Sequence, residues 1–427
     1  MATKKAKEIT FEKAIPAFLK YLADEGKLPV FGSSETNYEA HQPPLYYVLA
    51  IPFLWLSHLV GSLKAMRVLA VLSGGAMVVC TYLVAKRAYP EDEGVPLLAG
   101  AIVAFLPSQL TLNASVGNDS LAALMFSGFS LWVASRRGRT RAGGAMGIGA
   151  LLGLAMLTKL TCLVPVVLAP VAILIAPRAA KSKGETSSRL ARKTMRKGSR
   201  GKKNASRRPR AAATQGRGWS ALRTLLVAGA AALIICGWWL VRNQVLYGDP
   251  FALRVFQEVF GKDRPTPEYF LSRGFSAGTY AELVGVYTFR SFWGTFGQAN
   301  IFLPGSVYWI CLAVSVWIVA GWIRRGWEGR RGGGPAAGTG LGRWILLLQI
   351  ALLAASFLRF NVTFFQAQAR YLLPAATAIA IFMALGMLCI LPNRWRKAAS
   401  ILLSAAFFGY GVAALLMWGL PGYSAGG

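Results

Sequence analysis

The chain has 427 residues, of which 55% are hydrophobic and only 15% are charged, whereas soluble domains carry about 25% charged residues. A soluble protein of this length could not bury so much apolar surface in one or two cores. The five cysteines show no CxxC spacing, which excludes a disulfide-stapled secreted scaffold. The composition therefore indicates an all-α, polytopic integral membrane protein.

The first 66 residues are predicted to form an extracytoplasmic loop. Residues 1–20 are too polar and charged to cross a membrane. The apolar run Pro44–Val60 is 17 residues long and contains Pro52. It could cross the membrane, but a juxtamembrane helix lying in the interface fits its length equally well.

Ten apolar stretches then follow that are long enough, or nearly so, to cross about 30 Å of hydrocarbon as helices. We group them into an N-terminal bundle (67–177) and a C-terminal bundle (218–427), which includes an outer loop at 243–300. The ten stretches lie near residues 67–85, 95–113, 119–135, 143–158, 161–177, 219–241, 301–323, 341–358, 369–391 and 398–420.

Small residues recur on one face of the fourth stretch, and we expect another helix to pack closely there. They are Gly143, Gly147, Gly149 and Gly153.

The net charge of +30 is divided unevenly between the two sides of these stretches. Strict alternation places 30 basic and five acidic residues on one side, a net of +25, and 17 basic and 12 acidic residues on the other, a net of +5. The positive-inside rule makes the first side cytoplasmic. We therefore expect a multi-pass protein of the cell membrane with residues 1–66, the loop after Asn243 and the C-terminus outside.

The loop at 178–217 carries 15 basic residues against one acid. A pI near 10.5 and such a run could indicate binding of RNA or anionic lipid. The loop contains no Tyr or Phe that could stack on bases, however. We therefore predict a disordered cytoplasmic loop that fixes orientation, and no nucleic-acid partner.

Several enzyme classes are excluded by missing residues. Two histidines, His41 and His58, cannot form an HExxH or multi-His metal site within the chain. No GxxxxGK[ST] loop and no GxSxG elbow occur. Acid–base and charge chemistry on the predicted outer face remains.

Two acidic groups lie on that face. Glu39 and His41 precede Pro43-Pro44, which stiffens the chain and holds both close to the membrane surface; a rigid turn with Tyr anchors is the alternative. Asp119 opens a predicted span, where it could simply cap the helix. An acid at membrane depth is costly, however, and usually has a task.

Three cations also lie there. Lys159 occupies the turn between two short spans, where it could snorkel to the interface or point at a lipid phosphate. Arg242 and Arg370, the latter followed by Tyr371, mark the outer ends of spans, a position that the positive-inside rule disfavours. They would pair either with lipid headgroups or with a substrate phosphate.

The order of these motifs resembles the GT-C glycosyltransferases, particularly the group similar to protein O-mannosyltransferases and the lipid A aminoarabinose transferase. Residues 21–29 look like the amphipathic helix that precedes the proline motif in that group. The motifs that carry the resemblance are Glu39–Tyr47, Asn118-Asp119, Gly153–Lys159 and Gln368–Pro374.

The resemblance implies a juxtamembrane helix after Pro43-Pro44 and transfer of a sugar, with inversion, from a polyprenyl-phosphate donor to an acceptor hydroxyl on the extracytoplasmic face. The acceptor would be a lipid, glycan or protein. Such a reaction needs a carboxylate base and cations for the departing phosphate, and its transition state has oxocarbenium character.

The resemblance also assigns roles to residues of this chain. Asp119, as the second acid of the family pattern, and Glu39 are the catalytic candidates. Lys159 and Arg370 would hold the phosphate. The full set of expected substrate-binding residues is His41, Gln42, Lys159, Arg242, Arg370 and Tyr371. Glu39, His41 and Asp119 could share one face and bind a divalent cation, so the cofactor stays open.

The chain departs from the family pattern at its start. The family has an additional N-terminal span followed by an Asp-Glu pair, whereas only Glu8 and Glu12 lie near the expected position here. We therefore expect an N-terminally truncated chain. A transporter or flippase of lipid-linked sugars, and a catalytically inactive membrane partner, are the alternative functions.

Overall fold

The fold was analysed in a computed structural model, which describes residues 11–31, 38–57, 61–136, 142–175, 210–297, 299–330 and 340–425. The predicted disordered loop falls outside these ranges at residues 178–209. Its remaining part is helical, because α11 begins at Arg210.

Each of the ten predicted apolar stretches coincides with helix, so the expected all-α, polytopic fold is confirmed. The helices of the N-terminal part are α4 (Ser62–Ala88), α5 (Gly94–Phe105), α6 (Pro107–Ala114), α7 (Asp119–Ser135), α8 (Ala142–Met156), η2 (Leu160–Cys162) and α9 (Leu163–Leu174). Those of the C-terminal part are α11 (Arg210–Tyr247), α15 (Gly305–Arg330), α16 (Gly340–Thr363), η3 (Ala369–Tyr371), η4 (Leu373–Ala375), α17 (Ala376–Cys389), α18 (Asn393–Ala414), the π-helix η5 (Leu415–Gly419) and α19 (Leu420–Ala425).

The membrane helices differ in length. Among the described residues, five helices are long and apolar enough to cross a membrane, namely α4, α11, α15, α16 and α18 extended through α19. A sixth span would be the pair α5 and α6, which is bent by 56°. The bend lies at Leu106, whose extended conformation is the one favoured before a proline, here Pro107. Shorter apolar helices, including α7, α8 and α17, fill the interior.

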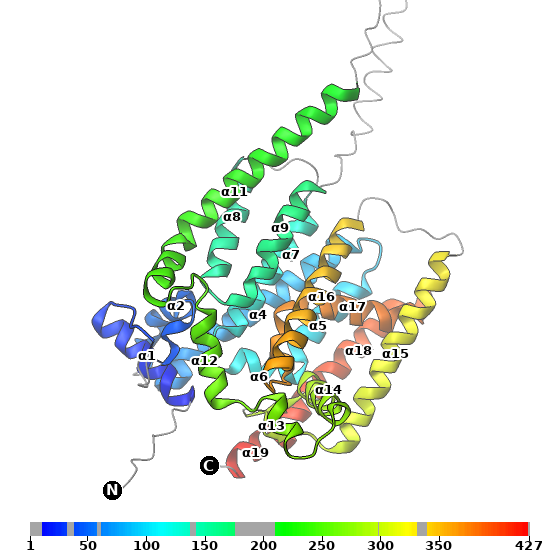
Figure 1. The fold of residues 1–427 in the computed structure, drawn as a ribbon. Coiled ribbons are helices and arrows are strands. Elements are labelled where there is room, and N and C mark those ends of the chain that lie inside the picture. Colours follow the sequence, from blue (N-terminus) through cyan, green and yellow to red (C-terminus); the bar gives the residue numbers. More distant parts are fainter. Residues whose placement is uncertain are drawn as a thin grey trace, which may run out of the picture.

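A second set of elements lies at the end of the bundle that carries both chain termini (Figure 1). It comprises α1 (Phe11–Glu25), η1 (Tyr38–His41), α2 (Leu45–Leu54), α12 (Leu253–Asp263), α13 (Pro267–Leu271), α14 (Ala277–Trp293) and the two-residue strands β1 (Thr295–Phe296) and β2 (Ile301–Phe302), which pair antiparallel.

Helix α2 occupies the run Pro44–Val60 that could have crossed the membrane. Its 10 residues span only about 15 Å at 1.5 Å per residue. That length is half the thickness of the hydrocarbon core, so the structure favours the juxtamembrane alternative.

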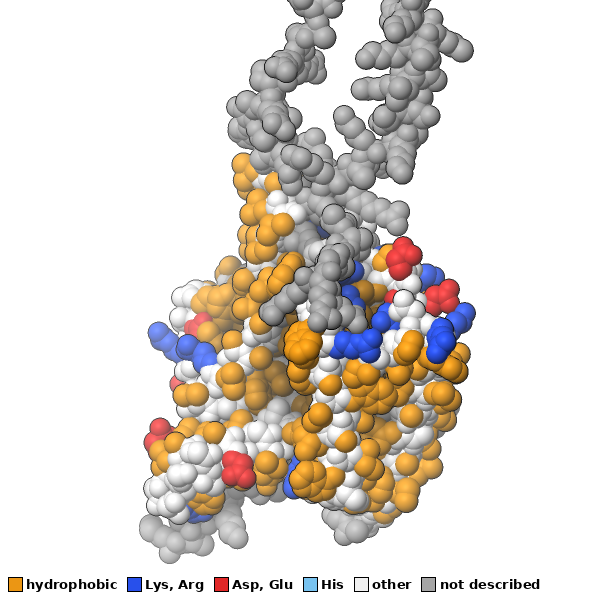
Figure 2. All heavy atoms as spheres, turned by 90° about the vertical axis from the view of Figure 1, so that its right-hand side faces the viewer, with side chains coloured by type: hydrophobic (Ala, Val, Ile, Leu, Met, Phe, Trp, Pro, Cys, Tyr) orange, Lys and Arg blue, Asp and Glu red, His pale blue; other side chains and the backbone are white. Residues whose placement is uncertain are grey.

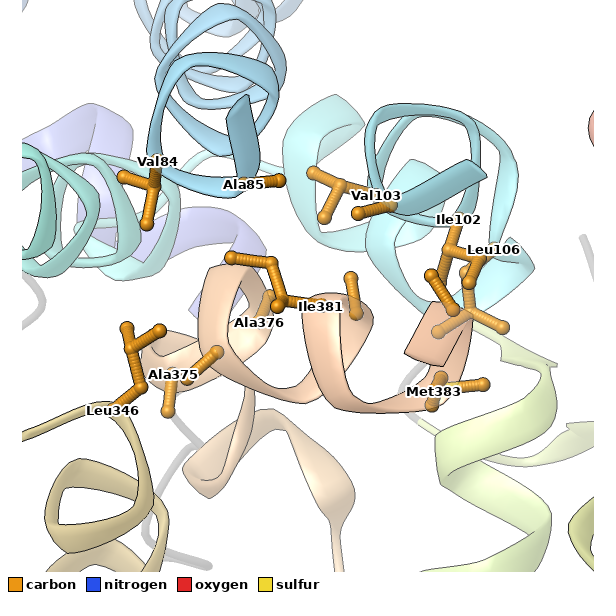
Figure 3. Close-up of a cluster of buried hydrophobic side chains, with 14 of the residues drawn as sticks. Val84, Ala85, Ile102, Val103, Leu106, Leu346, Ala375, Ala376, Ile381 and Met383 are labelled. Atoms are coloured by element: carbon orange, nitrogen blue, oxygen red, sulfur yellow. The ribbon is translucent and has the colours of Figure 1, made fainter. Parts of the chain in front are cut away.

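The interior is built around α17. Nearly all of its residues are buried, as expected for a helix that is apolar on every side. Figure 3 shows Met383 of α17 near Ile102 of α5 and Leu106, and Ala375 of η4 beside Leu346 of α16. Polar contacts add to this packing. The Thr377 hydroxyl lies 2.7 Å from the hydroxyl oxygens of both Thr81 and Ser127, and such bonds join helices in membranes.

The expected close packing against the glycines of α8 is present along α11. An ideal Cβ on Gly149 would lie 2.3 Å from the carbonyl oxygen of Ala228, and one on Gly153 would lie 2.8 Å from Cβ of Ile235. A Cβ on Gly143 or Gly147, in contrast, would meet nothing within 4 Å. Two of the four glycines therefore make the contact.

We expect Gly149→Ala to destabilise the protein by about 1–3 kcal/mol, because the added methyl group forces α11 away from α8. The measurement is the thermal unfolding midpoint in detergent. Gly147→Ala is the matched control on the same helix, and its midpoint should stay unchanged or rise slightly, because alanine is the better helix former. Equal midpoints for the two variants would contradict the packing.

Candidate active site

Four charged side chains from distant parts of the sequence face one another at the end of the bundle that carries the termini. Glu39 lies in η1, Asp119 is the first residue of α7, Lys159 lies in the turn after α8, and Arg370 lies in η3. The charges of Lys159 and Arg370 act on both Glu39 and Asp119. The structure thus brings together the two predicted acids and two of the predicted cations.

Local hydrogen bonds explain why these segments meet. The backbone N–H of Leu45, at the start of α2, donates to the carbonyl of Leu157 at 2.8 Å, which fixes the proline motif to the end of α8. The Asn118 amide donates to the carbonyl of Thr158 at 3.1 Å and to Oε1 of Gln42 at 3.4 Å. Asn118 therefore connects the start of α7 to both segments.

Asp119 and Lys159 form an ion pair across the site, with Nζ of Lys159 on Oδ1 of Asp119. The two side chains are 15% and 17% exposed, respectively. The side chain of Asn118, the N-cap residue of α7, makes no cap bond, and Asp119 lies in the first turn of that helix. The pair is shielded but open enough to be reached by a ligand.

Glu39 lies deeper in the site and is 1% exposed. Its Oε2 accepts a hydrogen bond from the Tyr47 hydroxyl at 3.1 Å, while Oε1 has no hydrogen-bond partner among the described residues. Burial raises the pKa of Glu39 from its ordinary value of 4.5 to about 7, against the opposing effects of Tyr47, Lys159 and Arg370. Its carboxyl therefore changes charge near neutral pH.

Arg370 is anchored through its neighbour. Its Nη2 donates to the Tyr371 hydroxyl at 3.3 Å, and that hydroxyl donates to Oε1 of Gln366 at 3.1 Å. The backbone N–H of Ala369 donates to the Ser291 hydroxyl at 2.8 Å, which ties η3 to α14. Nε of Arg370 is buried and has no partner among the described residues, so the guanidinium keeps a donor for a ligand.

His41 and Gln42 line the same region. The His41 ring packs edge-on against Phe31, with centroids 5.5 Å apart, and lies 6.2 Å from the ring of Phe256. Its Nε2 lies 3.1 Å from Nε2 of Gln42. Both side chains are next to Glu39 in η1 and the turn after it, as the motif predicts.

Arg242 lies elsewhere. Its Nη2 donates to the carbonyl of Pro29 at 2.7 Å, and its guanidinium lies over the Trp239 ring, 4.9 Å from the centroid. These contacts fasten α11 to the segment after α1. The structure therefore does not place Arg242 with the four charged residues.

Three neutral polar residues of the site, Tyr47, Asn118 and Gln366, were not among the predicted site residues. Asn118 and Tyr47 lie inside the quoted motifs, so their adjacency to Asp119 and Glu39 was a usable signal. Gln366 lies in an apolar and aromatic stretch that gives no such signal. Within the described residues, no group of three or more His, Cys, Asp or Glu side chains could hold a metal ion. Glu39, His41 and Asp119 therefore do not form such a group of three.

The raised pKa of Glu39 gives a pH test. The folded state holds this proton more tightly than the unfolded state, so its stabilising effect is complete below about pH 4.5 and is lost as the pH rises to about 7. Relative to Glu39→Gln, wild type should lose at most about 1.4 kcal/mol per pH unit across this window. Unfolding midpoints measured in detergent between pH 4.5 and 8 report the difference.

Tyr47→Phe is the informative control. It removes a hydrogen bond that lowers the pKa of Glu39, so the window should move to higher pH. A constant difference between wild type and Glu39→Gln from pH 4.5 to 7 would show that Glu39 does not titrate there.

Comparisons with known proteins were made over the whole chain. Residues 41–188 match the family model of dolichyl-phosphate-mannose-protein mannosyltransferase. That range contains His41, Gln42, Asp119 and Lys159. No curated protein matches the chain.

Three solved structures are similar at low identity. Cupriavidus metallidurans ArnT bound to undecaprenyl phosphate shares 15% identity over 96% of this chain and 68% of that one, with a TM-score of 0.46. The apo form of the same protein shares 14% sequence identity over 95% of this chain and 66% of that one, with a TM-score of 0.44. Archaeoglobus fulgidus oligosaccharyltransferase, in complex with zinc and sulfate, shares 14% sequence identity over 88% of this chain and 44% of that one, with a TM-score of 0.43. The chain thus spans about two thirds of ArnT and less than half of the oligosaccharyltransferase.

The architecture is that of a polytopic helical membrane protein, and residues 41–188, which carry three of the four sequence motifs in whole or in part, are similar to the mannosyltransferase family model.

Proposed function

We propose that this protein transfers a sugar from a polyprenyl-phosphate donor to an acceptor hydroxyl on the extracytoplasmic face of the cell membrane. The observation that carries the proposal is the cluster of Glu39, Asp119, Lys159 and Arg370 at one end of a membrane bundle. The termini and the loop helices α12–α14 lie at the same end (Figure 1). We infer that this end faces outward, because the predicted basic connections belong to the other end.

The charges of the cluster suit an anionic donor. Lys159 and Arg370 carry two positive charges, Asp119 carries one negative charge, and Glu39 is neutral below its pKa of about 7. A net positive charge in a shielded site attracts a phosphate. Arg370, with its unused Nε donor, and Lys159 would stabilise the phosphate that departs when the sugar leaves.

Asp119 is the candidate base. Its carboxylate is 15% exposed, so an acceptor hydroxyl could reach it, and it would take the proton of that hydroxyl as the sugar is transferred. Lys159 orients it and separates from it when the phosphate binds. Attack from the side opposite the phosphate would invert the configuration at the sugar carbon, through an oxocarbenium-like transition state.

Glu39 has a different place in this scheme. Because its carboxyl is buried behind Tyr47, we assign it the control of the charge around Arg370 and Lys159 rather than contact with the acceptor. His41, Gln42 and Tyr371 lie around the same opening and would contact the sugar or the headgroup. The acceptor would be a lipid, a glycan or a protein.

Asp119→Asn should lower the rate of sugar transfer by about 10²–10⁴-fold, the usual contribution of a positioned base. The assay follows consumption of a labelled polyprenyl-phosphate sugar in membranes that contain the protein and its natural acceptors. Glu268→Gln, which changes an exposed acid of α13 at the same end, should keep full activity. Equal rates for wild type and Asp119→Asn would remove Asp119 from the mechanism. If wild type moves the donor lipid across the membrane of vesicles without consuming it, the protein is a flippase. If wild type neither moves nor consumes the donor, the protein is an inactive partner.

Arg370→Lys should raise KM for the donor about tenfold or more, because it removes the planar guanidinium that can bind phosphate oxygens in pairs. Arg242→Lys is the matched control. Arg242 contacts Pro29 and Trp239 rather than the cluster, so its KM should stay near that of wild type. A similar rise in both variants would place Arg242 at the donor after all.

A further inference from the structure

Two arginines lie against one tyrosine at the opposite end of the bundle. Tyr89 directly follows α4 and is 7% exposed. The guanidinium carbon of Arg343, near the start of α16, lies 4.4 Å from the centroid of the Tyr89 ring, and that of Arg325, near the end of α15, lies 5.9 Å from it. Two positive charges thus share one aromatic ring.

Neither guanidinium uses its hydrogen-bonding capacity fully. Arg343 donates from Nη2 to the carbonyl of Ala88 at 3.2 Å, but its Nε is buried without a partner among the described residues. Arg325 donates from Nη1 to Sγ of Cys389 at 3.4 Å, and a thiol sulfur is a weak acceptor. Each guanidinium has five N–H donors, so several remain available.

Two nearby acids, Asp92 and Glu93, are already paired with other cations. Asp92 contacts Arg396 at 3.5 Å, and Glu93 contacts Lys397 at 2.9 Å. Among the side chains that the structure describes, no carboxylate forms a salt bridge with Arg325 or Arg343. Two partly buried cations without an anion are costly, since each keeps part of its desolvation penalty. Within the described part of the chain, the site therefore has no anion that would balance it.

Exposed tryptophans indicate the depth of this site. Trp327 follows Arg325 by two residues, Trp344 follows Arg343, and each is 65% exposed. Tryptophan is enriched at the level of lipid headgroups. Figure 2 shows the face along α15, where apolar side chains cover the lower part and Lys and Arg side chains gather above them. The neighbouring tryptophans therefore place the two arginines near the level of lipid headgroups.

We propose that Arg325, Arg343 and Tyr89 form a binding site for a phosphate group, supplied by the headgroup of an anionic phospholipid in the adjacent leaflet. A phosphate diester offers oxygens to both guanidiniums at once, each of which can bind two of them. The Tyr89 ring contacts the guanidinium groups of both arginines and so helps to hold them in place. Basic pockets between membrane helices on the cytoplasmic side are suited to such headgroups.

The test compares lipid binding by wild type and by the double variant Arg325→Gln/Arg343→Gln. Purified protein is titrated with phosphatidylglycerol, with phosphatidylcholine and with inorganic phosphate, and bound ligand is counted by native mass spectrometry. Wild type should prefer phosphatidylglycerol, and the double variant should bind it at least about tenfold more weakly, a loss of about 1.4 kcal/mol. The control Arg87→Gln/Arg394→Gln removes the same charge from exposed arginines of the same end and should bind like wild type.

The outcomes separate the two sources of phosphate. Arginine-dependent binding of phosphatidylglycerol that inorganic phosphate does not displace assigns the site to lipid. If inorganic phosphate binds as well as phosphatidylglycerol, and its binding also depends on the two arginines, the phosphate site is confirmed and free phosphate is its ligand. Unchanged binding in the double variant, or equal loss in the control pair, overturns the proposal. If the double variant fails to fold, Arg325→Gln alone gives the same comparison, because the contacts it loses, to Sγ of Cys389 and to the Tyr89 ring, are both weak.

Discussion

Charged groups can be held inside an apolar bundle only where they are balanced against one another. The ion pair between Asp119 and Lys159 meets this constraint, and the surrounding backbone is arranged to make it. Helix α7 must begin at Asp119, and α8 must end before Lys159, for the two side chains to meet. The bond from Leu45 to Leu157 then brings the proline motif, and with it Glu39, against the same pair. The site therefore depends on where several helices stop.

Short helices provide the space for these charges. With 17 residues in α7 and 15 in α8, the two helices extend about 25 Å and 22 Å, less than the hydrocarbon thickness of about 30 Å. The segments η1 and η3 bring Glu39 and Arg370 to the ends of these helices, where Asp119 and Lys159 lie. A polar recess in a membrane protein is tolerated where protein rather than lipid surrounds it. The difference in helix length thus creates a shielded site without interrupting the outer helices.

The sequence predicted the helices and the charged residues of the site much better than their neutral partners. All ten apolar stretches are helical because burial in a membrane demands uniform hydrophobicity, which can be read directly. Glu39, Asp119, Lys159 and Arg370 could be found because a charge at membrane depth is rare. Gln366 could not, since a single amide in an aromatic stretch has no periodicity and its role appears only when η3 turns back on α16.

Arg242 shows the limit of the same reasoning. It shares with Arg370 its place at the end of a span and its aromatic neighbours, yet its guanidinium closes onto the carbonyl of Pro29. Sequence position gives the depth of a side chain but not the direction in which it points. That direction is set by the path of the segment after α1, which no local pattern of residues determines.

The two ends of the bundle use arginine differently, and the positive-inside rule explains only part of this. Orientation requires no more than exposed basic residues in the loops, such as Arg87, which donates only to a carbonyl of its own helix. Arg343 goes further, because its Nε is buried beneath the protein surface and its guanidinium is held against Tyr89. Burying a cation costs free energy that an orientation signal does not need to spend. At the site end the same cost is offset by the Asp119 carboxylate, so at the other end an external anion is the balancing charge that the arrangement calls for.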